Sequence, residues 1–168
     1  MYSIKLIKTK KLEPMLDKAL PLAEKIWIFQ CDPEKYRIKN ALADNEVIKG
    51  FHWKVNKYEK EIAKGHIGLM WCCGKSAGIY AITELISDPG EFIESEAEKK
   101  YWIDSSDEEG VKFRVKMKLI ESLIENPVTK ETLKRNGLQE LSILRMWRGT
   151  NFRVTNEEWI TLKQLIEK

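Results

Sequence analysis

The feature that most limits how this chain can fold is a pair of apolar runs joined by a short glycine-containing segment, between Gly68 and Ile86. The joining segment is Gly-Lys-Ser-Ala-Gly at positions 74–78, and the run after it, 79–86, is rich in β-branched and aromatic residues. Runs of this composition are typical of strands, and glycine is a usual residue in the turn that joins two of them. The segment therefore predicts a β-hairpin.

The same Gly-Lys-Ser sequence also ends phosphate-binding loops, which would make the chain a nucleotidase or a kinase. That motif allows one residue fewer between its two glycines than the five bulky residues that separate Gly68 from Gly74. A helix should follow the motif, but the residues after Gly78 have the composition of a strand. We therefore favour the hairpin, with Lys75 in its turn.

Length, charge and apolar content indicate one compact domain. The chain has 168 residues, of which 43% are hydrophobic, and this is sufficient for one core. A net charge of +3 permits an anionic partner without requiring one. Lysines interrupt the apolar residues at the N-terminus, and no apolar run approaches the length that spans a membrane. We therefore expect a cytoplasmic protein without a membrane partner.

The cysteine and histidine positions argue against disulfides and metals. Cys31, Cys72 and Cys73 are odd in number and two of them are adjacent, which is not the framework of a disulfide-stabilised secreted domain. Neighbouring strand residues point to opposite faces, and His52 and His66 lack the spacing of metal ligands. We expect no metal and no cofactor.

In the first half of the chain, the sequence predicts strands at Ile26–Cys31 and Phe51–Val55. A helix is expected to begin at Asp32-Pro33 and to run to Ala43, because aspartate and proline are favoured at the first helical positions. Asn56 is expected to cap one or two helical turns that end at Gly65.

The second half contains three predicted helices and one strand. The helices are a short one over Ser95–Trp102, one that begins at Thr129 and ends at Asn136-Gly137, and a final one opened by the capping box of Thr155–Glu158. Residues 111–119 alternate strictly, with apolar residues on one face and Lys112, Arg114, Lys116 and Lys118 on the other. This cationic face is compatible with phosphate contacts, although the solvated side of a sheet is the preferred interpretation.

The sequence contains no recognised catalytic motif, whereas its tryptophans are placed unusually. Trp53 and Trp71 lie at strand ends beside polar turns, and Trp147 lies in a polar segment. Aromatic side chains at the mouth of a barrel can stack on a flat heterocycle while nearby polar groups contact its edge. The alternative, that each tryptophan packs in the core, remains open at this point.

Several segments resemble, in order, the blocks of the EVE domain family. They are residues 26–33, 52–56, 65–71 and 78–85, and residues 149–155 resemble a closing block of EVE proteins found with prokaryotic restriction systems. The resemblance extends from Ile26 almost to the end of the chain. We therefore expect one domain over residues 26–168, preceded by an extension over residues 1–25 whose prolines allow only a short or kinked helix.

The resemblance implies an α+β, PUA-like fold, which is a small mixed β-barrel with flanking helices and is related to the YTH readers of methylated adenine in RNA. It implies a protein that is not an enzyme and that flips a modified, methylated nucleobase, in DNA above all, into an aromatic-walled pocket. The expected partners are DNA or RNA carrying the modified base and a restriction or other effector protein. We expect the protein itself to be a monomer.

Within this family, Trp53 matches the tryptophan that walls the pocket. The other residues expected in the base-binding pocket are Trp71, Gln30, Asp32, Asn56, Trp147, Thr150 and Asn151. The residues expected to contact phosphates are Lys54, Lys75, Arg148 and Arg153. Gln30, Asp32 and Asn56 are expected to offer donors and acceptors to the edge of the base, although many EVE domains have Lys-Ser-Glu-Pro at the end of the first strand.

Two other functions remain open. One is an RNA-binding accessory module of the PUA type, which would be insensitive to base modification. The other is an RNA-modifying or nucleolytic enzyme, because PUA-like barrels also accompany such chemistry. Fold analogy alone does not separate these functions.

Overall fold

The computed structural model describes residues 25–106, 108–146 and 148–168, and the predicted extension over residues 1–25 lies almost wholly outside them. The predicted hairpin is confirmed, because β3 (Ile67–Cys72) pairs antiparallel with β4 (Gly78–Leu85). Gly74 in the connection has a φ of 98°, a left-handed conformation that glycine adopts without steric cost. This hairpin of β3 and β4 forms the centre of the sheet.

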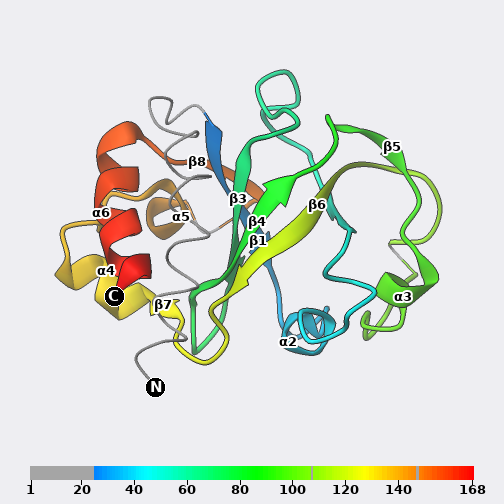
Figure 1. Cartoon of the computed structure of the whole chain (residues 1–168), viewed down its shortest axis with the longest axis horizontal. Coiled ribbons are helices and arrows are strands. Elements are labelled where there is room, and N and C mark those ends of the chain that lie inside the picture. The colour runs from blue at the N-terminus through cyan, green and yellow to red at the C-terminus, as the bar shows by residue number, and fades with distance from the viewer. Residues whose placement is uncertain (1–24, 107, 147) are drawn as a thin grey trace.

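The strands form one mixed sheet (Figure 1). The order along it is β2 (Phe51–Lys54), β6 (Lys112–Ser122), β4, β3, β1 (Ile26–Cys31) and β8 (Asn151–Arg153). In addition, β5 (Gly90–Phe92) pairs with β6, and β7 (Val128–Thr129) pairs with β4. β1 and β3 run parallel, and the other named pairs of the described strands are antiparallel. This curled mixed sheet with flanking helices confirms the expected α+β architecture.

Among the described residues, five helices pack around the sheet (Figure 1). They are α2 (Ile38–Ala41), α3 (Glu96–Lys99), α4 (Lys130–Arg135), α5 (Ser142–Arg145) and α6 (Asn156–Glu167). Three predicted helix starts are confirmed: Ser95 and Thr155 form capping boxes, and the Thr129 side chain accepts from the backbone N–H of Thr132. No helix of the described residues is long and apolar enough to cross a membrane.

Two helix predictions need correction. The helix expected after Asn56 is absent, because residues 55–66 form turns in which Tyr58 has a left-handed φ of 60°. The helix expected over residues 32–43 is shorter, because residues 33–35 form a turn and only Ile38–Ala41 is helical. In the first case Gly65 has a left-handed φ of 89°, but it follows turns rather than a helix, because tertiary packing overrides the local preference of these residues.

The alternation predicted for residues 111–119 holds only in part. Val115 and Met117 are fully buried, whereas Val111 and Phe113 are exposed. Arg114, which was expected on a solvated face, is 1% exposed. The reason is that residues 90–110 cover this part of β6 and supply backbone carbonyl groups to the Arg114 guanidinium.

The sheet is buried on both faces by two separate apolar cores. In β1, Ile26 and Ile28 point into an α6-side core that includes Trp159 on α6. Trp27 and Phe29 point into an α2-side core that includes Ile38 on α2. A strand that is buried on both faces has a continuous apolar run rather than an alternating one, and this explains the composition of β1 and β3.

The two end strands of the sheet, β2 and β8, are joined by the side chain of Asn151. Its Nδ2 donates to the carbonyl oxygen of Lys54 at 3.0 Å, and its Oδ1 accepts from the backbone N–H groups of Asn56 and Lys57 at 2.9 and 3.2 Å. Asn151 is 3% exposed, so these bonds are shielded from water. Asn151 thus closes the curled sheet through a side chain rather than through strand pairing.

Candidate functional site

A cavity of about 760 Å³ opens where the parallel strands β1 and β3 end. β1 contributes Gln30 and Cys31, the residue after it contributes Asp32, and β3 contributes Trp71. Parallel strands bring their carboxyl ends to the same edge of a sheet, so the two chain segments meet there. Small-molecule sites in proteins have volumes of roughly 300–1,000 Å³, and this cavity is in that range.

Three aromatic rings form a wall of the cavity: Tyr36, Trp53 and Trp102. The rings of Trp53 and Trp102 are nearly parallel, with 6.4 Å between their centroids and 21° between their planes. Tyr36 contacts both, at 5.5 Å from Trp53 and 4.7 Å from Trp102. A backbone bridge between Tyr36 and Trp102 brings these distant parts of the sequence together. Tyr36 and Trp53 are only 2% and 7% exposed, whereas Trp102 is half-buried, so Trp102 offers the most ring surface for stacking on a planar molecule.

Trp53 and Trp71 both line the cavity, as their sequence positions suggested, but in different ways. Trp53 belongs to the α2-side core, and its indole Nε1–H donates to the carbonyl oxygen of Gln30 at 3.1 Å. Trp71 belongs to the α6-side core and is 3% exposed. Trp102, which the sequence analysis did not single out, completes the wall instead. Its sequence position, at the end of a short predicted helix beside an acidic loop, carries no signal for this role.

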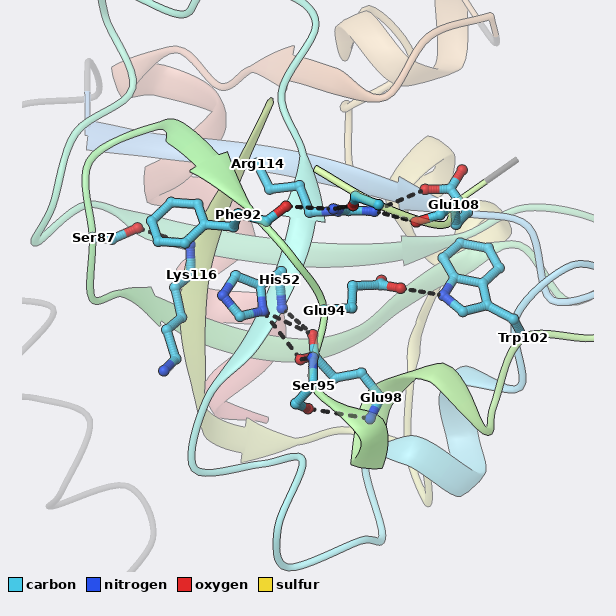
Figure 2. A network of polar contacts seen from close by, with 11 residues as sticks. His52, Ser87, Phe92, Glu94, Ser95, Glu98, Trp102, Glu108, Arg114 and Lys116 are labelled. Carbon is cyan, nitrogen blue, oxygen red and sulfur yellow. Dashed lines mark hydrogen bonds and ion pairs between the residues drawn. The ribbon is translucent and has the colours of Figure 1, made fainter. Parts of the chain in front are cut away.

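A cluster of charged side chains lies beside Trp102 (Figure 2), and we refer to it as the charged cluster. Its members are His52, Glu94, Glu98, Glu108 and Arg114. Except for Glu98, all of them line the cavity. The cluster lies between β2, β6 and the segment of residues 90–110, three parts of the chain that the sequence did not connect.

His52 and Glu98 form a buried pair within the charged cluster. The Nδ1 of His52 lies 3.0 Å from Oε2 of Glu98, and Oε1 of Glu98 accepts from the backbone N–H of His52 at 2.5 Å. Burial would raise the pKa of Glu98, but the hydrogen bonds from His52 and Ser95 outweigh burial and lower the pKa. Glu98 lies on α3 and His52 lies on β2, so the hydrogen bonds between them hold α3 against β2.

Arg114 fixes the chain around the cavity. Its Nη1 donates to the carbonyl oxygen atoms of Phe92 and Gly110 at 2.7 and 3.2 Å. Its Nη2 donates to the carbonyl oxygen of Glu108 at 2.7 Å and lies 3.6 Å from the Glu108 carboxylate, which also pairs with Lys54 at 2.7 Å. A guanidinium can make several such bonds at once because its donors are arranged in a rigid plane.

Glu94 is held differently from the other acids. It is 6% exposed, and its Oε2 accepts from the indole Nε1–H of Trp102 at 2.8 Å. Burial raises the pKa of the Glu94 carboxyl, and the Trp102 hydrogen bond and the Arg114 charge oppose this effect only in part. The carboxyl group thus orients the Trp102 ring and lines the cavity beside it.

The polar residues predicted for the pocket divide into two groups. Gln30, Asp32 and Thr150 line the cavity, whereas Asn56 and Asn151 are not among its lining residues. Gln30 is held in place, because its Nε2 donates to the carbonyl oxygen of Gly149 at 2.6 Å. Asn56 donates to Thr150 Oγ1 at 3.3 Å, and Asn151 closes the sheet. Trp147 lies outside the described residues.

The predicted phosphate contacts divide in the same way. Lys54 and Arg148 line the cavity, together with Lys35 and Lys130, which the sequence analysis did not select. Lys75 and Arg153 are not among the lining residues. Arg153 instead forms an ion pair with Glu61, and its guanidinium lies 4.9 Å from the centre of the Tyr58 ring.

The chemistry of the cavity is that of a binding site for a flat, polar molecule. The aromatic wall offers stacking surface, the charged cluster offers acceptors, and the lysines and arginine among the lining residues offer positive charge to an anion. Among the described residues, no group of three or more His, Cys, Asp or Glu side chains is placed to hold a metal ion.

Comparison with known proteins identifies the family of this chain. The family model of the EVE domain matches residues 25–165. No curated protein matches the sequence at a significant level.

Solved structures match the fold at low sequence identity. Human THYN1, in a crystal structure with 5-methylcytosine-containing DNA, has a TM-score of 0.60 at 16% identity, covering 85% of this chain and 98% of THYN1. Rpa0253 from Rhodopseudomonas palustris has a TM-score of 0.59 at 18% identity, covering 84% of this chain and 92% of its own. A mutant of an ASCH protein from Zymomonas mobilis has a TM-score of 0.50 at 12% identity, covering 84% of this chain and 96% of its own. At these identities the matches establish the fold alone.

Proposed function

The chain belongs to the EVE domain family, and from this premise we propose that it is a non-catalytic reader that binds a methylated nucleobase in DNA. The base leaves the helix and enters the cavity at the ends of β1 and β3. The observation that carries the proposal is the aromatic wall of Tyr36, Trp53 and Trp102. The structure of human THYN1 with 5-methylcytosine-containing DNA supports it, because the two folds are similar over nearly the whole of THYN1.

Stacking on the aromatic wall is sufficient to offset the cost of taking the base out of the duplex, without a catalytic step. Taking a base out of a duplex costs a few kcal/mol, and each stacking contact with an aromatic side chain contributes about 1–3 kcal/mol. One or two contacts with the aromatic wall are therefore sufficient to offset extrusion. Specificity for the methyl group then depends on apolar contacts with the same rings.

Positive residues of the cavity are suited to the DNA backbone. Lys35, Lys130 and Arg148 line the cavity together with Lys54. Contacts with phosphates carry no sequence information, but they release counterions and make the affinity dependent on salt. Lys35→Ala or Lys130→Ala should reduce the slope of log K against log salt by about 1. Lys75→Ala, outside the cavity lining, is the matched control and should leave the slope unchanged.

The decisive experiment measures binding to matched DNA and RNA oligonucleotides that carry 5-methylcytosine, hydroxymethylcytosine, methyladenine or no modification. We expect the methylated DNA to bind best, and Trp102→Ala to weaken that binding by about 10- to 100-fold, since a stacking contact is lost. Ile103→Ala is the matched control, because Ile103 is the next residue, is 52% exposed and does not line the cavity. Equal binding of modified and unmodified strands would exclude a reader.

The same panel separates the other functions. An RNA-binding accessory module would prefer RNA and ignore the modification, and an enzyme would turn over one of the oligonucleotides. We further propose that the protein acts as a monomer in the cytoplasm, together with a restriction or other effector protein. The free thiols of Cys31, Cys72 and Cys73 support the reducing compartment.

A further inference from the structure

Glu94 differs from the other residues of the cavity because its carboxyl group is buried but only half hydrogen-bonded. It follows β5, lines the cavity and is 6% exposed. Figure 2 shows its side chain directed toward Trp102, whose Nε1–H donates a hydrogen bond to Oε2. Across the described residues, no donor is within hydrogen-bond distance of Oε1.

The nearby donors do not bond to this oxygen. The Arg114 guanidinium donates to the backbone carbonyl groups of Phe92, Gly110 and Glu108 and pairs with the Glu108 carboxylate. His52 pairs with Glu98. Oε1 is not among the fully buried side-chain atoms that lack a partner, so it keeps solvent access in a residue that lines the cavity, where a donor on a ligand can reach it. The raised pKa of Glu94, caused mainly by burial, is consistent with this incomplete pairing.

The amide side chains expected to contact the base edge are already engaged within the fold. Gln30 donates to the carbonyl oxygen of Gly149, and Asn56 donates to Thr150. Asn151 uses both its amide nitrogen and its oxygen to close the sheet. Glu94 therefore offers an acceptor beside the aromatic wall that is not committed to the fold.

We propose that Glu94 determines which bases this cavity accepts, because its Oε1 accepts a hydrogen bond from the exocyclic amino group of the bound base. The cavity then selects bases with an amino group on the Watson–Crick edge over their oxo counterparts. This inference rests on the proposed function, since it requires a base in the cavity. It adds Glu94 to Gln30 and Asp32, the lining residues already expected to contact the base edge.

The chemistry of the two base types gives the direction of the selection. Cytosine presents its N4 amino group as a donor, which a carboxylate accepts well. Thymine has a carbonyl oxygen at the same position, so two acceptors would face each other in a buried site. The N3–H of thymine is flanked by carbonyl oxygens on both sides, which repel a carboxylate. 5-Methylcytosine and thymine carry the same 5-methyl group, so they differ only in this edge.

Glu94→Gln changes this contact while keeping the shape of the side chain. The amide oxygen can still accept from Trp102 Nε1–H, and this orientation places the amide NH₂ where Oε1 was. A donor at this position suits the O4 of thymine and opposes the amino group of cytosine. The variant should therefore lose the preference for amino-bearing bases or reverse it.

The experiment measures binding by fluorescence anisotropy to duplexes with 5-methylcytosine or thymine opposite an abasic site, so that neither base must be unpaired. Adenine and hypoxanthine form a second pair that tests the same contact on a purine. The proteins are the wild type, Glu94→Gln and the control Glu91→Gln. Glu91 is a nearby exposed glutamate on β5 that does not line the cavity.

We expect the wild type and Glu91→Gln to bind the amino member of at least one pair about 10- to 100-fold more tightly than the oxo member. Glu94→Gln should lose or reverse this ratio and keep a melting temperature at least equal to that of the wild type. Equal binding of both members by a wild type that still distinguishes methylated from unmethylated DNA would overturn the role of Glu94 alone. A Glu94→Gln protein that melts early and binds no duplex would show that Glu94 is structural, and this would also overturn it. Loss of all discrimination by methylation would overturn the proposed function itself.

Discussion

The α6-side core and the charged cluster flank the same sheet, but they hold it together in different ways. The α6-side core is built from apolar side chains of β1, β3, β4 and the C-terminal helices, including Trp159 and Leu162. The charged cluster is also largely buried, with Arg114 and Glu98 each 1% exposed, although Glu108 is 14% exposed. It depends on directional hydrogen bonds between segments far apart in the sequence.

We infer from this difference that the α6-side core mainly stabilises the fold, whereas the charged cluster mainly shapes the cavity. Apolar packing is not directional, so the α6-side core tolerates substitutions that preserve volume. Each charge of the cluster requires its own partner, and an unsatisfied one is costly. The cavity borders the charged cluster, and there the incompletely paired Glu94 carboxyl group and the half-buried Trp102 ring remain available to a ligand. Four substitutions test this comparison.

The largest effect is expected from Trp159→Ala in the α6-side core. Trp159 is 1% exposed, and truncation of a buried tryptophan leaves a cavity that costs about 3–5 kcal/mol in the free energy of unfolding. Urea denaturation measures this loss. The control is Ile160→Ala, which removes a 55% exposed side chain from the same helix and should have little effect. The fraction of Trp159→Ala that remains folded should bind DNA normally, and a binding defect in it would couple the two regions.

Arg114→Met should cost about 3 kcal/mol, because it leaves the Glu108 carboxylate and several carbonyl groups without a buried partner. Unlike Trp159→Ala, this change should also abolish DNA binding, since Arg114 holds residues 92 and 108–110 around the cavity. Lys116→Met, on the same strand, is the control and should change stability by less than about 0.5 kcal/mol. Normal binding by folded Arg114→Met would show that the charged cluster does not shape the cavity.

A smaller effect is expected where the two end strands of the sheet meet. Asn151→Ala removes the hydrogen bonds to Lys54, Asn56 and Lys57 and should cost about 2 kcal/mol. If Asn151 acts only by closing the sheet, the variant should keep the base preference of the wild type, measured at a temperature where it is folded. A changed preference with unchanged stability would return Asn151 to the base-binding residues.

The smallest effect concerns pH. The pKa of Glu98 is lowered in the folded protein, so its ionised form contributes stability above its unfolded pKa of about 4.3, and this contribution is lost as pH falls through the folded pKa. The difference in melting temperature between wild type and Glu98→Gln should therefore narrow below about pH 5. Glu94 has a raised pKa, so its ionisation weakens the fold as pH rises through that value. Glu94→Gln is therefore the control, because its melting-temperature difference from the wild type should change with pH in the opposite direction. A constant difference for Glu98→Gln would show that the His52 pair does not depend on the Glu98 charge.

Local patterns predicted most elements of the fold well, and two of the departures are instructive. The hairpin, β1, β2 and the caps at Ser95, Thr129 and Thr155 follow from residues that are adjacent in the sequence. The missing helix after Asn56 and the buried Arg114 do not, because distant segments decide both. Alternation can show that two sides of a strand differ, but it cannot show what covers each side.

The candidate site was predicted less completely than the fold. Trp53, Trp71, Gln30, Asp32, Thr150, Lys54 and Arg148 are among the residues that line the cavity. Tyr36, Trp102 and Glu94 were missed, although they form most of the aromatic wall and the acceptor beside it. Their sequence neighbours give no periodic signal. Glu94 and Trp102 lie beside His52 of β2 and Arg114 of β6 (Figure 2), and a backbone bridge joins Tyr36 to Trp102.

The sequence by itself determined the family resemblance, the hairpin, the first two strands and the starts of three helices, because strand composition, turn residues and caps act over a few neighbouring positions. The tertiary structure alone decided which charges are buried, which amides are already engaged and which carboxylate oxygen lacks a partner. The physical reason is that burial and hydrogen-bond satisfaction depend on contacts between distant segments. Trp102 and Glu94 acquire their place in the site from such contacts and from nothing in their own sequence neighbourhood.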